Sequence, residues 1–108
     1  LKRQQDHFKH MWSSLEDCLT LVEQSHPRKR DEIDTKQTVC KDLIALFENE
    51  AEPNMKFYIE ACKVELAHKR QIEGDSHDAR ALEKEITKLG ERLDGIMRRV
   101  LTLKTATA

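Results

Sequence analysis

The sequence predicts an all-α fold, an antiparallel bundle of amphipathic helices, and three observations support this prediction. The 108 residues include only three glycines and two prolines, fewer than the many turns of a β-rich fold require. Charged residues make up 36% of the chain and hydrophobic residues 38%, a balance typical of helices with a narrow apolar stripe and a charged outer face. Apolar residues also recur at intervals of three and four, which place them on one face of a helix.

The length of the chain corresponds to one domain, which we place at residues 1–104. The chain begins at Leu1, without an initiating methionine and already inside a helical pattern. We therefore expect the domain to have been excised from a longer protein. Residues 105–108, Thr-Ala-Thr-Ala, are expected to form a disordered tail.

The first helix is predicted at residues 2–24, where an apolar stripe runs along the segment. It ends before Pro27, because a residue that precedes proline disfavours the α conformation. A second helix is predicted to begin near Asp31. Its apolar face is wider than one seam, so we expect it to contact two neighbouring helices.

The segment at residues 48–54 decides how many helices the bundle contains. Inside a helix, Pro53 would lose a hydrogen bond and clash with the carbonyl of Asn49, at a cost of about 3 kcal/mol. In the first turn of a new helix the same proline costs little. The sequence therefore favours a break, a third helix at residues 53–73 with Gly74 just after its end, and a four-helix bundle. The alternative is a three-helix bundle with a long middle helix kinked at Pro53.

This three-helix alternative resembles spectrin-type and co-chaperone three-helix domains in outline. Trp12 in the first helix is the residue that carries the likeness to a spectrin repeat. The rest of that family's pattern is absent from the chain, so the resemblance implies an outline of three helices and no site or partner.

The last helix is predicted at residues 76–103, with Ser76 as its cap. Its apolar residues alternate in steps of three and four, the spacing of a left-handed bundle or coiled-coil seam. The seam mixes aliphatic types in a way that suits a single bundle, so we expect the domain's own core to use it. The seam residues are Ala79, Leu82, Ile86, Leu89, Leu93, Ile96, Val100 and Leu103.

Beside this seam, Met97 and Leu101 broaden the apolar surface, with Arg98 and Arg99 next to them. An apolar face broader than one bundle contact requires is a candidate groove for a partner. These four residues are the predicted partner-binding site.

The densest positive run is Arg28, Lys29 and Arg30, which suggests a localisation signal or a phosphate contact. Acidic residues follow at once, so a solvated charged face is the favoured interpretation. The net charge of −1 and the aromatic content of 5% argue against a nucleic-acid site. Binding of nucleic acid or phosphoinositide headgroups through the basic clusters is the less favoured, alternative function.

No catalytic motif, metal site or cofactor site is predicted. His7 and His10 are three residues apart, but no second pair of ligands accompanies them. The odd number of cysteines, Cys18, Cys40 and Cys62, suits free buried thiols and an intracellular location, in the cytoplasm or the nucleus. No stretch is apolar enough to predict a membrane span.

From this pattern we expect a non-enzymatic protein-interaction module of the scaffold or adaptor type. Its partner would be another protein bound through an exposed helical face, or a second copy of the chain in a homo-oligomer. This expectation rests on amphipathic helices with charged outer faces, in a sequence that contains no catalytic, metal-binding or cofactor-binding motif.

Overall fold

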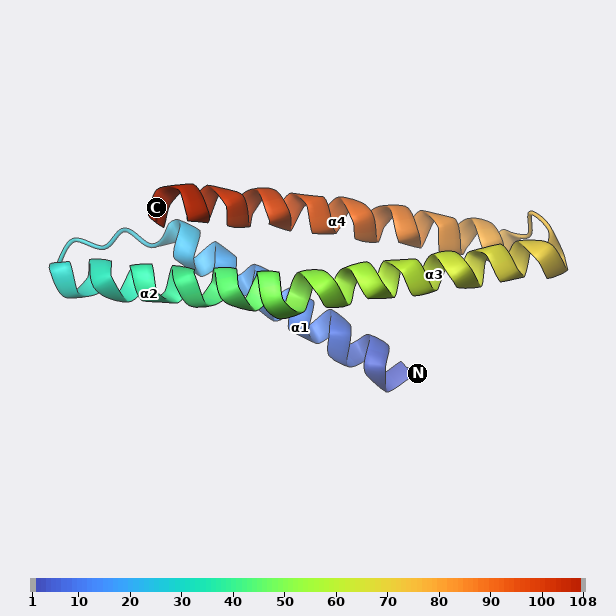
Figure 1. Ribbon diagram of the computed structural model, residues 1–108, viewed down its shortest axis with the longest axis horizontal. Coiled ribbons are helices and arrows are strands. Elements are labelled where there is room, and N and C mark those ends of the chain that lie inside the picture. Colours follow the sequence, from blue (N-terminus) through green and yellow to red (C-terminus); the bar gives the residue numbers. More distant parts are fainter. Residues whose placement is uncertain (1, 108) are drawn as a thin grey trace.

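A computed structural model describes the backbone of residues 2–107 and the side chains of residues 8–106. Within that range the chain is almost entirely helical. The elements are α1 (Lys2–Gln24), α2 (Arg30–Leu46), the π-helical turn η1 (Phe47–Ala51), α3 (Glu52–Glu73) and α4 (His77–Thr107). Because α2, η1 and α3 follow one another without a gap, the described chain consists of three helical rods, with overall dimensions of 61 × 25 × 20 Å (Figure 1).

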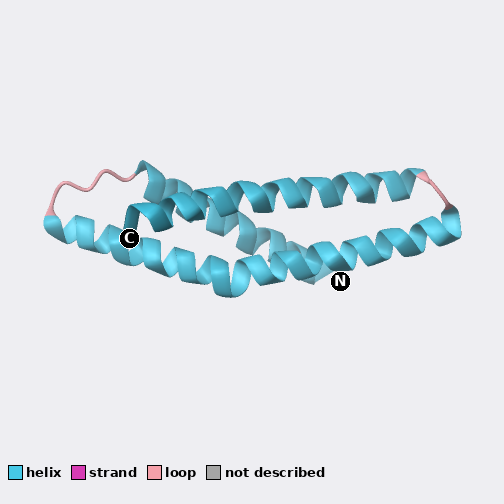
Figure 2. Cartoon of the chain, turned by 45° about the horizontal axis from the view of Figure 1, so that its top comes forward, coloured by secondary structure: helices cyan, strands magenta, loops and turns pink. Residues whose placement is uncertain are grey.

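The long rod formed by α2, η1 and α3 runs antiparallel to α4, which lies along most of its length (Figure 1). The shorter α1 packs against one half of this pair. In the other half, the end of α3 and the start of α4 extend past α1 as a two-helix hairpin (Figure 2). As the sequence predicts, α2 contacts two neighbours, α1 and α4.

The preferred four-helix bundle is not confirmed, and the three-helix alternative with a long middle helix fits the structure. The expected break at residues 48–54 is instead the π-helical turn η1, closed by the amide of Glu52, which donates to the carbonyl of Phe47. Pro53 follows in the first turn of α3. A π turn is wider than an α turn, and it accommodates a proline that would clash with the preceding turn of a regular α-helix.

The π turn also explains why the buried residues stay on one face of the long rod. From Leu43 to Ile59 they are separated by steps of four, and each such step overshoots a full α-helical turn by about 40°. The extra residue in η1 takes up much of this rotation. The buried residues in this run are Leu43, Phe47, Ala51, Met55 and Ile59.

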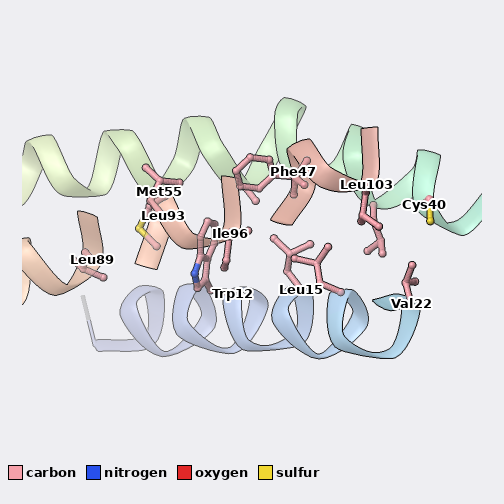
Figure 3. Close-up of a cluster of buried hydrophobic side chains, with 14 of the residues drawn as sticks. Trp12, Leu15, Val22, Cys40, Phe47, Met55, Leu89, Leu93, Ile96 and Leu103 are labelled. Carbon is pink, nitrogen blue, oxygen red and sulfur yellow. The ribbon is translucent and has the colours of Figure 1, made fainter. Parts of the chain in front are cut away.

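The core lies where α1, the long rod and α4 meet, and Trp12 is at its centre (Figure 3). Its side chain is fully buried and reaches from α1 into the space between the other two rods. The ring of Trp12 lies 6.2 Å from that of Phe47, and Phe8 stacks on Tyr58 with ring centres 5.0 Å apart. Five of the eight predicted seam residues of α4 lie in this core, so the expectation that the domain's own core uses the seam is confirmed. The buried seam residues of α4 are Ala79, Leu89, Leu93, Ile96, Val100 and Leu103.

The ends of α3 and α4 follow the predicted signals. Gly74 ends α3 with a φ of 69°, a conformation that glycine adopts without strain. The hydroxyl of Ser76 accepts a hydrogen bond from the amide of Ala79 at 3.2 Å, so Ser76 caps α4 as expected. At its other end α4 continues to Thr107, and most of the predicted disordered tail is helical instead; Ala108 lies outside the described residues.

The π turn η1 contains one residue more than the corresponding α-helical turn. Deleting one residue of η1 and replacing Pro53, which the wide turn accommodates, should therefore restore a regular α-helix. We expect the variant with Asn49 deleted and Pro53→Ala to fold with a regular α-helix through this region. Deleting Asn49 alone should cost about 3 kcal/mol more, because Pro53 would then clash with the preceding turn. Circular dichroism and urea unfolding measure both effects.

The matched control is deletion of Glu60, an exposed residue of α3. It rotates the rest of α3 by about 100° and moves Cys62 and Leu66 off the buried face. We expect this deletion to cost more than about 3 kcal/mol. Equal losses for the Glu60 deletion and the combined Asn49 and Pro53 variant would contradict the proposed role of η1.

Candidate interaction surfaces

Two ion pairs set the position of α1 on α4. Glu16 pairs with Arg92 and Glu23 with Arg99, and both pairs join residues 76 positions apart. A constant separation means that the two helices run parallel at this contact. The Nε atom of Arg99 lies 3.1 Å from both carboxylate oxygens of Glu23, and its Nη2 donates to the hydroxyl of Thr20 at 3.1 Å.

The hydrogen bond from Arg99 holds the pKa of the Glu23 carboxyl below its usual value. The same contact raises the pKa of Arg99. Both shifts belong to an ion pair that joins two helices. The predicted site residue Arg99 therefore serves a contact within the domain.

The predicted flank on α4 is otherwise present as an exposed surface. Met97 is 37% exposed and Leu101 is 63% exposed, one helical turn apart. Arg98, between them in the sequence, is exposed as well. One turn beyond Leu101, Lys104 pairs with Glu48 of η1, so the flank lies on the side of α4 that faces the long rod.

A second surface, which the sequence pattern does not indicate, is a hollow of about 380 Å³ between the end of α1 and the start of α2. Leu21 and Val39 line it and are 69% and 40% exposed. Leu21 precedes the buried Val22 and Val39 precedes the buried Cys40, so the sequence does not separate these exposed residues from the core face. The one sequence feature that could have indicated the exposure of Leu21 is its spacing, which does not match the apolar stripe of its helix.

A third group of exposed apolar residues lies on the outer face of α3. Phe57, Val64 and Ile72 are 78%, 70% and 69% exposed. Their spacing of seven and eight residues places them on one side of the helix, away from the buried residues of α3. None of the three belongs to the hydrophobic core.

The predicted basic cluster lies at one tip of the molecule. Arg28 and Lys29 belong to the connection between α1 and α2, Arg30 opens α2, and all three are exposed. Their region is also held by an acidic residue, because Glu32 accepts hydrogen bonds from the amides of Arg28 and Lys29 at 3.2 and 3.5 Å. The basic and acidic side chains of this tip are therefore intermixed.

Only two of the three cysteines are buried as expected, since Cys18 is exposed. Burial raises the pKa of the Cys62 thiol, and it also raises the pKa of Tyr58, whose side chain lies against that thiol. A raised pKa keeps the thiol protonated, and the protonated form is a poor nucleophile. Cys62 is therefore a packing residue.

The described residues include no group of three or more His, Cys, Asp or Glu side chains that could hold a metal ion. His10 is exposed, and the side chain of His7 lies outside the described range. Among residues 2–107, no helix has the length and apolar character needed to cross a membrane.

Comparisons with protein-family models, with curated proteins and with solved structures find no match to this chain. The candidate surfaces therefore rest on the geometry of this chain alone.

The ion pair between Glu23 and Arg99 should make stability depend on pH. Because the pKa of Glu23 is lowered in the folded state, its contribution is present above the ordinary glutamate pKa, about 4.3, and is lost as the pH falls through the lowered value. We expect Glu23→Gln to destabilise the domain by about 0.2–1 kcal/mol near neutral pH, in the range of partly exposed pairs. The loss should vanish at low pH, where the carboxyl is protonated.

Urea unfolding of both proteins near pH 7 and near pH 2.5 tests this dependence. Glu60→Gln is the control, because among the described side chains Glu60 pairs with Lys63 alone, a residue of the same helix. Equal destabilisation by Glu23→Gln at both pH values would show that the carboxylate charge does not hold α1 on α4.

Proposed function

We propose that this chain is a non-enzymatic protein-interaction module, of the scaffold or adaptor type, that binds another protein through the Met97–Leu101 flank of α4. The observation that carries the proposal is the exposure of these two large apolar side chains on a helix that buries its own seam beside them. Apolar side chains that remain in water and lie next to each other are typical of binding surfaces.

The surroundings of the flank support the same function. Arg98 is exposed beside it, and the ion pair between Lys104 and Glu48 closes one end. An apolar centre with a charged rim is the usual composition of a protein interface. α4, which carries the flank, is packed against the long rod along most of its length, so a partner would meet a preformed surface.

The titratable groups favour a binding role over catalysis. The pKa shifts of Glu23 and Asp75 come from ion pairs with arginine, and those of Tyr58 and Cys62 come from burial. Each of these shifts has a structural cause. One hollow at the described surface is lined by both Glu23 and Cys40. The carboxylate of Glu23 is engaged there by Arg99, and its lowered pKa makes it a weaker base.

Substitution of the flank should abolish partner binding without unfolding the domain. We expect Met97→Glu combined with Leu101→Glu to reduce capture of partner proteins from cell extract by more than tenfold. A tenfold change in affinity corresponds to about 1.4 kcal/mol, and burying a charge in an apolar contact costs more than that. Quantitative mass spectrometry of the captured proteins measures the change, and circular dichroism confirms the retained helix content.

The matched control is Phe57→Glu combined with Val64→Glu, which changes two exposed apolar residues on the outer face of α3. Capture should persist with this variant. Light scattering of both variants and the parent protein tests the alternative occupant, a second copy of the chain. Capture that survives the α4 substitutions would contradict the proposed flank.

A further inference from the structure

The flank on α4 belongs to a longer face of the same helix. On an α-helix, residues 90, 94, 97, 98 and 101 lie within an arc of about 100°, and no other residue between 90 and 101 falls in that arc. The five residues, which form the α4 face, are Gly90, Asp94, Met97, Arg98 and Leu101. The last four are exposed, and Gly90 is partly exposed. The α4 face is therefore open to solvent over about 17 Å of helix.

Gly90 is a gap in the α4 face that packing within the domain does not use. A glycine inside a helix lowers the stability of the helix relative to alanine. Among the described residues, a Cβ atom added at Gly90 would meet no packed neighbour within 4 Å. The fold thus does not require a glycine here, and the gap leaves room for a side chain of another molecule.

The two charges of the α4 face are not engaged by the chain itself. Among the described side chains, neither Asp94 nor Arg98 takes part in an ion pair. The neighbouring arginines of α4, Arg92 and Arg99, each pair with a glutamate of α1. Asp94 and Arg98 therefore offer one negative and one positive charge, one helical turn apart, to a molecule that approaches this face.

The order of these residues along α4 is complementary to itself when two copies run antiparallel. Residues equally far from a two-fold axis, in opposite directions, then lie across from each other. The midpoint of Asp94 and Arg98 is residue 96, and the midpoint of Gly90 and Leu101 lies between residues 95 and 96. One axis near residue 96 therefore serves both pairs, and Met97 lies beside it.

In this register the two copies make complementary contacts. Arg98 of each copy meets Asp94 of the other, and Leu101 of each copy lies over the gap at Gly90 of the other. The two Met97 side chains meet near the axis. A parallel arrangement would place like charges opposite each other and gap opposite gap, so the charges favour the antiparallel one.

We propose that a second copy of this chain covers the α4 face when no other partner is bound, by antiparallel contact of α4 with α4. Because the contact is about 17 Å long, the interface is small and the dimer forms reversibly as the concentration rises. The inference rests on the flank of the proposed function and adds its regulation, since a partner protein must displace the second copy from Met97 and Leu101.

Two charge substitutions test the register. Asp94→Arg places an arginine against Arg98 of the second copy, and Arg98→Asp places an aspartate against Asp94. Sedimentation equilibrium at low ionic strength measures the mass of each protein from about 10 μM to 1 mM. We expect the mass of the parent chain to rise from 12.6 kDa toward twice that value, and each variant to dimerise at least tenfold more weakly.

A mixture of the two variants is the decisive sample. In a mixed dimer, one copy carries both arginines and the other carries both aspartates, so each charge again meets its opposite. We expect the equimolar mixture to dimerise at least as strongly as the parent chain. Mixing does not repair a damaged fold, so this recovery would report on the interface itself. Circular dichroism of each variant measures the helix content.

A pair of glycine substitutions tests the gap. Gly90→Leu fills the space that Leu101 of the second copy occupies, and we expect it to weaken dimerisation by tenfold or more. Gly95→Leu is the matched control, because Gly95 is exposed on another side of α4 and also has no packed neighbour within 4 Å among the described residues. Its mass should follow that of the parent chain.

Asp17→Arg is the control for the charge substitutions, because it makes the same change at an exposed acid of α1. Equal weakening by Asp17→Arg and Asp94→Arg, or by the two glycine substitutions, would overturn the proposal. So would a mixture that fails to dimerise, or a parent chain that stays at 12.6 kDa up to 1 mM. A monomeric chain whose capture of other proteins depends on Met97 and Leu101 would refute the dimer and leave the proposed function intact.

Discussion

The architecture depends on a row of buried residues that continues without a break through the π turn η1. Phe47 and Ala51 are the first and last residues of η1, Met55 follows Pro53, and each is at most 2% exposed. Their burial requires the rod to continue past the proline, and the π turn is the local distortion that permits it. Because the rod is continuous, α4 packs along most of its length, and α1 covers only one half of the pair.

The position of α1 then creates both candidate surfaces. Trp12 anchors the helix in the core, and the pairs of Glu16 and Glu23 with Arg92 and Arg99 hold its other side to α4. α1 also packs against α2, and Leu21 and Val39 line an open hollow beside that contact. The α4 flank remains exposed for a related reason, since α1 occupies the other side of α4.

The indole nitrogen of Trp12 adds a cost to this arrangement. It is buried, and among the described residues it has no hydrogen-bond partner. An unsatisfied buried donor costs about 1–3 kcal/mol. Full burial of the large indole side chain offsets part or all of this cost, at about 25 cal/mol per Å² of apolar surface removed from water.

The sequence by itself determined the helical class, the span of α1, the end of α3 at Gly74, the cap at Ser76 and the α4 seam, because these features depend on neighbours along one helix. It also identified Met97 and Leu101 as an apolar flank. Only the tertiary structure decided the continuation of the helix past Pro53, the use of Arg99 within the domain, the exposure of Cys18 and the hollow between α1 and α2. The local cost of a proline, about 3 kcal/mol, can be outweighed by burial against other helices, and the open side of a helix is defined only once its neighbours are in place.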